Sequence, residues 1–335
     1  MMSIAVNGRF LSRQVTGVER YGQEILKRLE PDLRIIHPSR GARGLSGHAW
    51  EQLILPAKLR PRELLWSPAN TGPLAVRNQV WTVHDLSPLE HPEWYMPAFA
   101  HWYRCFVPLL AHRAKQVVVS SDYMRRKILR RFAMPRAKVT VVPGGVDHAH
   151  FKPGLARLAS LPGEYVLFVG SLQQRKNLGL LLQAWKLIQP KHPHTWLLIA
   201  GASGIVFNQT AFPTDLEHVG WLGYIPEAEL PRLYANALVF VHPSLEEGFG
   251  LTALEAMACG APLLAARAGA LPEVVGDAAL WFQSDNVSQL AENLNYCLNE
   301  PGLRAALAEK SLARAEAFGW DQPAKLLWEV MQWCQ

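Results

Sequence analysis

The sequence predicts an α/β protein built from two doubly wound domains, and three observations lead to this fold class. The chain of 335 residues is longer than one hydrophobic core usually organises. Short apolar runs typical of buried strands alternate with helical patterns along its length. The alternation restarts with a strong strand at residues 165–169, after a stretch that ends at Pro162 and Gly163. We therefore expect two halves of similar size, each with its own sheet.

The first half, residues 1–152, is expected to carry a helix over about residues 18–29 after its first strand. A second helix should open at residues 48–52 and end at Pro56, because proline interrupts helical hydrogen bonding. A strongly basic helix is expected at residues 122–132. The strands expected in this half lie at residues 3–6, 79–83, 117–119 and 139–142.

The second half is expected over residues 153–318 and follows the same alternation. Its helices are expected at about residues 227–235, 251–259, 287–299 and 301–317. Its strands are expected at residues 165–169, 196–200, 261–266 and 279–282. Two further short strands are expected, of which one begins at Val219 and the other ends at His242.

The most informative stretch covers residues 240–276. An apolar strand runs into a turn with two glycines, and a helix and a second apolar run follow. Ligands bind at such turns in open α/β sheets, because the amides and the dipole at a helix N-terminus attract anions. Glu247 lies on the turn and Glu255 on the helix. This pattern predicts a site that holds a phosphate with its amides and hydroxyl groups with its acids, both of which a nucleotide sugar offers.

Three other turns carry groups suited to ligand binding. Arg175 and Lys176 follow a strand and are placed to neutralise a diphosphate, although a surface pair of cations has the same pattern. His84 precedes an aspartate where a buried strand ends, which indicates either a site residue or a structural hydrogen bond. Gly17 lies between the first strand and the first helix, as a backbone close to a ligand or as an ordinary turn glycine.

The charge and the cysteines limit the partners and the compartment. Residues 1–150 carry 22 Lys and Arg against 11 Asp and Glu, whereas residues 151–335 carry 12 against 17. The basic residues at 113–138, after an aromatic segment, predict contact with an anionic membrane, although a solvated amphipathic helix has the same composition. The four scattered cysteines, the lack of a signal-peptide core and the lack of a long apolar run favour a cytoplasmic protein.

Two other function classes account for less of the sequence. An NAD-dependent dehydrogenase would also have two Rossmann-like halves, but no strand is followed by Gly-x-Gly-x-x-Gly and a later ribose-binding acid. A nucleic-acid-binding protein would explain the net charge of +6, but the excess is confined to one half and no known module occurs. We therefore expect no nucleic-acid partner.

Several segments, in this order and spacing, match the signatures of one family. They are Thr16-Gly17-Val18-Glu19-Arg20-Tyr21, His84-Asp85, Val142-Pro143-Gly144-Gly145-Val146-Asp147, Gly170 with Arg175-Lys176-Asn177, Leu222-Gly223-Tyr224, residues 243–251, 254–260 and 271–276, and Phe318-Gly319-Trp320. With these segments the chain resembles the retaining glycosyltransferases of family 4, which have the GT-B fold. The resemblance implies two Rossmann-like domains facing across a cleft, an N-terminal acceptor-side domain and a C-terminal donor-binding domain. A last helix, at about residues 319–335, would cross back onto the N-terminal domain.

The resemblance also implies catalytic roles for His84, Arg175, Lys176 and Glu247. Glu247 and His84 would contact the donor sugar, and the two cations would stabilise the charge that grows on the diphosphate as the glycosidic bond breaks. Among the donor-binding residues, Glu255 would hold the ribose hydroxyls. The donor-binding residues that the resemblance implies are Gly17, Ser171, Tyr224, Gly248, Phe249, Gly250, Leu251 and Glu255.

One position departs from the family pattern, because many members have an arginine where this chain has Ser171, and Arg175 is the available substitute. The chain contains no Asp-x-Asp and the family needs no metal, so we expect neither a metal nor another cofactor. Because no carboxylate nucleophile is evident on the N-terminal side, front-face attack is favoured over double displacement.

The expected function is transfer of a hexose from a nucleotide sugar to a saccharide on a lipid, such as a polyprenyl-diphosphate-linked acceptor, in surface polysaccharide synthesis. Mannose from GDP-mannose is the leading hypothesis, because the motifs are similar to those of mannosyl- and rhamnosyltransferases. A UDP- or dTDP-sugar is an alternative donor, and a nucleotide-sugar epimerase is the alternative GT-B enzyme. The expected location is the cytoplasm, peripheral at the inner face of the membrane.

Overall fold

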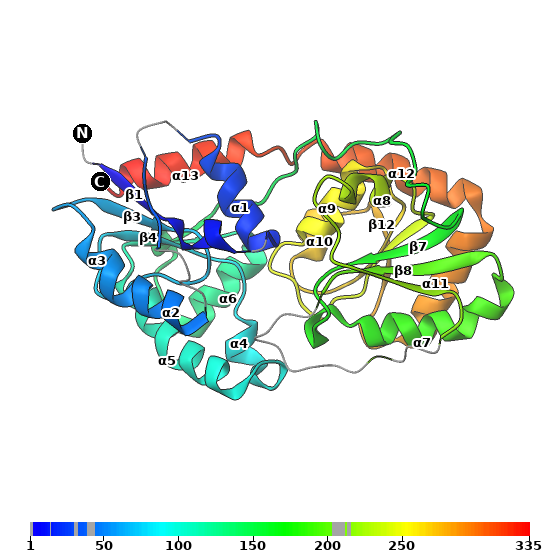
Figure 1. The fold of residues 1–335 in the computed structure, drawn as a ribbon, viewed down its shortest axis with the longest axis horizontal. Coiled ribbons are helices and arrows are strands. Elements are labelled where there is room, and N and C mark those ends of the chain that lie inside the picture. The colour runs from blue at the N-terminus through cyan, green and yellow to red at the C-terminus, as the bar shows by residue number, and fades with distance from the viewer. Residues whose placement is uncertain (1–2, 14, 30–32, 39–43, 203–211, 213–215) are drawn as a thin grey trace. The chain divides into compact units, whose positions relative to one another are not determined.

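The computed structural model describes residues 3–13, 15–29, 33–38, 44–202, 212 and 216–335. The chain divides into two compact units, each built around one sheet (Figure 1). Unit 1 comprises Met1–Glu90, Ala98–Gly145 and Trp320–Gln335, and unit 2 comprises His91–Pro97 and Val146–Gly319. Each unit has one six-stranded parallel sheet with helices on both faces, which confirms the expected α/β class.

The sheet of unit 1 has the strand order β2-β1-β3-β4-β5-β6, and every pair is parallel. The order changes direction between β1 and β3, and ligands bind near such reversals in doubly wound sheets. The strands are β1 (Ile4–Asn7), β2 (Arg34–Ile36), β3 (Leu64–Ser67), β4 (Gln79–Val83), β5 (Gln116–Val119) and β6 (Val139–Val141).

The helices of unit 1 cover both faces of this sheet. Figure 1 shows α1 and α13 along one face and α2, α3 and α5 along the other. The helices are α1 (Gly17–Leu26), α2 (Gly44–Ala49), α3 (Leu55–Ala57), α4 (Ser87–Glu90), α5 (Pro97–Arg113), α6 (Asp122–Phe132) and α13 (Asp321–Trp333), with short 3₁₀ turns η1 (Gly8–Ser12), η3 (Pro92–Trp94, in unit 2) and η4 (Arg136–Lys138).

The helix predicted to open at residues 48–52 and end at Pro56 is present, but it begins earlier and ends one residue later. Helical structure begins at Gly44 in α2, passes through a π-helical turn, η2 (Trp50–Ile54), and continues beyond the proline into α3. Pro56 lies in the first turn of α3, where a missing N–H is tolerated. The proline therefore accompanies a change in helical pitch and does not end the helix.

The sheet of unit 2 has the order β12-β11-β10-β7-β8-β9, again with parallel pairs throughout. This is the order of dinucleotide-binding Rossmann folds, with the reversal between β7 and β10. The strands are β7 (Glu164–Val169), β8 (Thr195–Ala200), β9 (Val219–Gly223), β10 (Val239–His242), β11 (Leu263–Ala266) and β12 (Ala279–Phe282).

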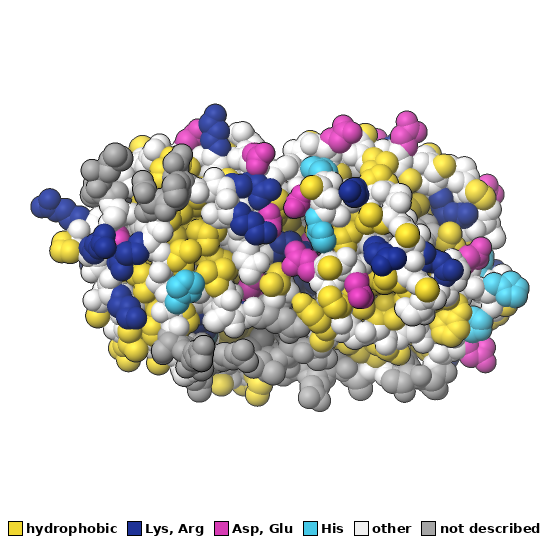
Figure 2. Space-filling model, turned by 45° about the horizontal axis from the view of Figure 1, so that its top comes forward, with side chains coloured by type: hydrophobic (Ala, Val, Ile, Leu, Met, Phe, Trp, Pro, Cys, Tyr) yellow, Lys and Arg dark blue, Asp and Glu magenta, His cyan; other side chains and the backbone are white. Residues whose placement is uncertain are grey.

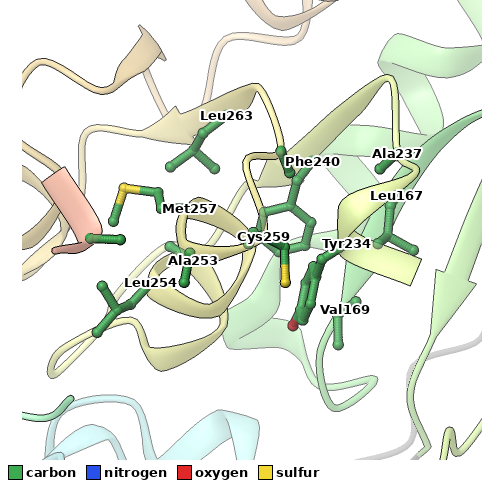
Figure 3. Close-up of a cluster of buried hydrophobic side chains, with 14 of the residues drawn as sticks. Leu167, Val169, Tyr234, Ala237, Phe240, Ala253, Leu254, Met257, Cys259 and Leu263 are labelled. Carbon is green, nitrogen blue, oxygen red and sulfur yellow. The ribbon is translucent and has the colours of Figure 1, made fainter. Parts of the chain in front are cut away.

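Two apolar layers enclose the sheet of unit 2. Figure 3 shows part of one layer, where Tyr234, Phe240 and Met257 pack with side chains from α8, α9 and the strands. The other layer is made largely by α7 and α11. The helices are α7 (Leu178–Ile188), α8 (Leu230–Ala235), α9 (Leu251–Ala258), α10 (Leu271–Val275), α11 (Val287–Asn299) and α12 (Pro301–Ala315), with 3₁₀ turns η5 (Gln174–Lys176) and η6 (Gln189–Lys191).

The domain boundary lies earlier than the predicted end at residue 152. Val146 is the first residue of the long segment of unit 2, and its backbone N–H donates to the Phe318 carbonyl over 2.8 Å. Val146 and Phe151 are both buried in the core that contains Tyr234. Val146 and Phe151 belong to unit 2 because their side chains are buried in its core.

The last segment of the chain, Trp320–Gln335, belongs to unit 1. The buried Trp320 ring meets the edge of Tyr21 with ring centroids 5.8 Å apart, and Asp321 accepts from Arg28 Nε over 2.8 Å. Tyr21 and Arg28 belong to α1 and the residues just after it, so the segment is held by an aromatic contact and an ion pair.

Candidate functional site

The candidate site of unit 2 lies at the carboxyl ends of β7 and β10, where the strand order reverses. Arg175 and Lys176 belong to η5, which follows β7, and Glu247 lies in the turn that follows β10. The backbone joins the two turns, because the Leu245 N–H donates to the Arg175 carbonyl over 2.9 Å. Asn177 adds a side-chain bond to the Pro243 carbonyl over 3.0 Å. The topology therefore brings together residues that are about seventy positions apart.

The Glu247 carboxylate is the centre of this site. Its Oε2 atom accepts from Arg175 Nη1 over 3.1 Å. Its Oε1 atom accepts from Lys176 Nζ, from Ser244 Oγ over 2.9 Å, and meets His242 Nε2 at 3.1 Å. Both cations are largely buried together with the acid. The structure thus brings three of the four predicted catalytic residues into direct contact.

Two opposing influences act on the pKa of Glu247. Burial alone would raise it, but Lys176, Arg175 and His242 outweigh burial and hold the pKa of Glu247 well below its ordinary value. Burial lowers the pKa of His242, which favours a neutral imidazole. The group of two cations and one carboxylate therefore keeps one net positive charge, which suits an anionic ligand.

His242 and Ser244 were not among the predicted site residues, although both contact Glu247. His242 is the last residue of β10 and Ser244 lies two residues after it, and both are buried. The sequence signal was present, because polar residues at the carboxyl end of a buried strand mark ligand sites in this fold class. That signal does not show the contacts with Glu247, which form only when the turn after β10 folds.

Glycine is required where the backbone of the site turns. Gly250 has φ +102°, and Gly269 has φ +57°. A Cβ atom on Gly269 would come within 2.3 Å of the Glu247 carbonyl oxygen, and the neighbouring Ala270 N–H donates to that oxygen over 2.9 Å. The loop that carries Gly269 therefore supports the backbone of the central acid.

Glu255 lies on α9 and is only 1% exposed. Its side chain is not among the described contacts of Glu247. Its Oε2 atom accepts from the hydroxyl of Tyr234, on α8, over 3.1 Å. Burial and the nearby Glu255 charge raise the pKa of the Cys259 thiol to about 12, so this thiol stays protonated. The two glutamates therefore occupy separate polar environments.

The remaining predicted residues of unit 2 surround the turn and the neighbouring strand ends. Ser171 accepts from Gln173 Nε2 over 2.5 Å directly after β7. Phe249 is buried against Phe318 with ring centroids 6.1 Å apart, and Leu251 begins α9 after Gly248 and Gly250. Tyr224 follows β9 and is 50% exposed.

Glu246 differs from its neighbour in the chain. Arg175 Nη1 donates to the Glu246 main-chain carbonyl over 2.9 Å, whereas the Glu246 carboxylate lies 4.0 Å from His91 Nε2. Arg175 and Lys176 each form an ion pair with the Glu247 carboxylate. Glu247 therefore pairs with both cations, at 3.1 Å from Arg175 Nη1 and in direct contact with Lys176 Nζ.

His84 and Gly17 belong to unit 1, apart from the residues of unit 2. His84 follows β4 and its Nε2 atom lies 2.8 Å from the Pro68 carbonyl. Its ring meets Tyr21 edge-on with centroids 4.8 Å apart, and Tyr21 lies on α1, which begins at Gly17. Burial lowers the pKa of His84, so the neutral ring is favoured. Tyr21 thus links the two predicted residues within unit 1.

Two protein-family models match most of the chain. The model "Glycosyl transferases group 1" matches residues 158–314, in unit 2. The model "Glycosyltransferase Family 4" matches residues 64–150, chiefly in unit 1. The matches fall on the two parallel sheets described above.

Curated relatives agree with these models. An O-antigen chain mannosyltransferase B of Escherichia coli is 28% identical over 92% of this chain and 93% of its own length. A D-inositol 3-phosphate glycosyltransferase of Kineococcus radiotolerans is 33% identical over 65% of this chain. The alignment spans only 57% of the length of that relative.

Solved structures share the fold of the whole chain. A sucrose-phosphate synthase from Thermosynechococcus elongatus has a TM-score of 0.74 at 19% identity, with 99% of this chain and 98% of that chain covered. Anabaena Alr3699/HepE, in complex with UDP-glucose, has a TM-score of 0.78 at 18% identity and covers 99% of this chain and 100% of that chain. The fold is therefore GT-B. With this fold, the chain is similar to the group 1 and family 4 glycosyltransferases, whose models match its two halves.

Proposed function

We propose that this glycosyltransferase moves a mannosyl residue from GDP-mannose to a lipid-linked saccharide acceptor in surface polysaccharide synthesis. The observation that carries the proposal is the alignment with an O-antigen chain mannosyltransferase along nearly the full length of both chains. The buried group of Arg175, Lys176 and Glu247 supports it with a suitable chemistry. A diphosphate would meet the cations, and a sugar hydroxyl would meet the acid.

Arg175 and Lys176 have enough N–H groups to bind both the Glu247 carboxylate and a diphosphate. The Arg175 guanidinium has five N–H donors and the Lys176 ammonium has three, so each can hold Glu247 and a phosphate oxygen together. As the glycosidic bond breaks, negative charge grows on the leaving diphosphate, and fixed cations stabilise that charge. In this proposal the two side chains replace a metal ion, and no cofactor takes part.

The proposed stereochemical course is retention by front-face attack, in which the leaving phosphate helps to deprotonate the acceptor hydroxyl. In this course Glu247 binds a donor hydroxyl and forms no covalent bond to the sugar. Its pKa, held far below the ordinary value, keeps it an anionic acceptor of hydrogen bonds. A covalent glycosyl-enzyme seen by mass spectrometry would contradict this course.

UDP-glucose is a second candidate donor, because a solved structure of the same fold holds that ligand. A thermal-shift panel of GDP-, UDP-, dTDP- and ADP-linked sugars, each beside its bare nucleotide, separates the candidates. We expect GDP-mannose to raise the melting temperature most, since a ligand that binds only the native state stabilises it by mass action. A larger shift from UDP-glucose would replace the proposed donor, and no shift from any sugar nucleotide would contradict the proposal.

We also propose contact with an anionic membrane through residues 113–138, by electrostatic attraction and not through an apolar helix face. The apolar side chains of α6, Met124, Ile128 and Phe132, are buried in the core of unit 1, so this helix does not offer an apolar face to lipid. Among the described residues, no helix is long and apolar enough to cross a bilayer. Any attraction by this segment would therefore be electrostatic.

The charge distribution agrees with such a mode. Residues 1–150 carry 22 Lys and Arg against 11 Asp and Glu, whereas residues 151–335 carry 12 against 17. Figure 2 shows Lys and Arg side chains on one face of the molecule. Flotation with vesicles that contain anionic lipid should recover the protein at low salt and lose it at high salt, because salt screens exposed charges. Failure to float at low salt would remove the membrane from the proposal.

The proposed acceptor activity distinguishes a transferase from an epimerase on the same fold. An epimerase turns over its donor without an acceptor. We expect release of nucleoside diphosphate from the donor to depend on an added lipid-linked saccharide. Equal turnover with and without acceptor would favour the epimerase.

A further inference from the structure

We propose that His242 is a positioning residue which, as a neutral imidazole, holds the Glu247 carboxylate so that its Oε2 atom receives a hydroxyl group of the donor sugar. This inference rests on the proposed function, because it assigns Glu247 to the sugar of a nucleotide sugar. It concerns a residue that does not itself touch the substrate.

The two oxygens of Glu247 have unequal sets of partners. Oε1 is surrounded by Lys176 Nζ, Ser244 Oγ and His242 Nε2, the last two at 2.9 and 3.1 Å. Oε2 accepts one bond among the described residues, from Arg175 Nη1 over 3.1 Å. A carboxylate offers about two acceptor sites on each oxygen. Oε1 is therefore fully occupied, and Oε2 keeps an acceptor site for a ligand.

The contacts of the imidazole determine its tautomer. Glu247 is ionised, so the His242 Nε2 atom, 3.1 Å from it, must carry a proton to form a favourable contact. On the other side of the ring, Thr252 Oγ1 lies 3.3 Å from Nδ1, and a hydroxyl can donate to that nitrogen. The Ser244 hydroxyl, 3.3 Å from Nε2, already donates to Glu247. A neutral ring with its proton on Nε2 satisfies all of these contacts.

Neutrality matters because the site already contains two cations. Arg175, Lys176 and Glu247 together carry one positive charge, and the titratable and charged groups that face His242 are these three. A protonated His242 would add a third cation beside Lys176 and draw Glu247 toward itself. A neutral N–H donor orients the carboxylate and leaves both cations to share their remaining donors with a diphosphate.

The test compares His242→Phe, which removes the donor, with His242→Gln, which keeps an N–H group near the position of Nε2. Affinities for GDP and GDP-mannose are measured by calorimetry on the full chain, and for UDP and UDP-glucose if the donor panel favours that pair. Ser311→Ala is the matched control, because Ser311 is a buried residue of unit 2 that donates to the Ala261 carbonyl and has no described contact with Glu247. Melting temperatures of all variants show whether they fold.

We expect His242→Phe to lower the affinity for the sugar nucleotide by about ten- to a hundredfold, which corresponds to one charge-assisted hydrogen bond. The affinity for the bare nucleotide should stay the same, since a neutral ring contributes no charge. His242→Gln should restore most of the sugar affinity.

Equal losses of sugar-nucleotide and bare-nucleotide affinity in His242→Phe would show a structural or charged role and overturn the inference. No loss of either would also overturn it. If His242→Phe does not fold, failure of the folded His242→Gln variant to keep the preference for sugar nucleotide over bare nucleotide overturns the inference in the same way. Wild-type protein that binds no sugar nucleotide at all would instead contradict the proposed function.

Discussion

The Lys176 ammonium group donates directly to the Glu247 carboxylate, although 71 positions separate the two residues in the chain. The contact exists because β7 and β10 are neighbours in the sheet of unit 2, so the turns that follow them meet at one edge. Arg175 adds a second ion pair to the same acid over 3.1 Å. The chemistry of the site therefore follows from the strand order.

The first prediction concerns the two adjacent acids, Glu247 and Glu246. Glu247→Gln should reduce kcat/KM for the donor by about 100- to 1000-fold, the range found when a preorganised polar partner is removed from an active site. The bare nucleotide should bind at least as tightly as before, because Arg175 and Lys176 lose their competing anion. Steady-state kinetics and calorimetry on the same preparation measure both effects.

Glu246→Gln is the matched control, since it makes the same chemical change one position earlier. Its carboxylate lies 4.0 Å from His91 Nε2, whereas the Glu247 carboxylate forms the ion pairs with Arg175 and Lys176 described above. We expect less than about a tenfold change in kcat/KM for the donor. A larger effect at Glu246 than at Glu247 would reverse the assignment of the two acids.

Most of the strands and the centre of this site could be predicted from the sequence. The sequence alone shows apolar runs such as that at β7, and also the spacing of Glu247 and Glu255. Neither depends on knowing the fold. His242 was missed because its role depends on a contact with Glu247 across a turn. The long segment of unit 2 begins at Val146, before the predicted boundary at residue 152, because burial of Val146 and Phe151 is a property of the folded core.

The second prediction concerns the loop that supports the backbone of Glu247. Gly269→Ala should destabilise the protein by about 1–3 kcal/mol, because alanine is strained at positive φ and its Cβ would meet the Glu247 carbonyl oxygen. Urea denaturation measures the change in the free energy of unfolding. Gly302→Ala is the control, since Gly302 lies in α12 with open space around its added Cβ and should be neutral or stabilising.

The third prediction separates the nucleotide from the sugar. Tyr234→Phe removes the hydroxyl that donates to Glu255 and keeps the ring in the core shown in Figure 3. If Glu255 holds the ribose, the affinity for the bare nucleotide should fall by about three- to tenfold, the equivalent of one modest hydrogen bond. The ratio of sugar-nucleotide to bare-nucleotide affinity should not change. A change in that ratio alone would place Glu255 at the sugar instead.

The fourth prediction concerns the stability of unit 1 in mild acid. Burial, and then the charges of Arg9 and Arg13, lower the pKa of His48 to about 3. Arg9 Nη1 donates to His48 Nδ1 over 3.1 Å and to Glu51 over 2.9 Å, so the imidazole accepts from the guanidinium and is neutral when folded. Glu51 lies 3.9 Å from His48 but forms an ion pair with Arg9. It therefore does not stabilise a protonated His48.

Because the unfolded chain binds a proton at His48 below about pH 6.5 and the folded chain does not, the free energy of unfolding should fall as pH decreases from about 6.5 toward 3. One such group contributes at most about 1.4 kcal/mol per pH unit. Urea denaturation at pH 7 and pH 5 should show a smaller loss for His48→Gln than for the wild type. His148→Gln, which replaces an exposed histidine, should lose as much stability as the wild type. An identical loss in His48→Gln and wild type would mean that His48 is not the group that couples folding to pH, and that the Arg9 contact does not keep it neutral.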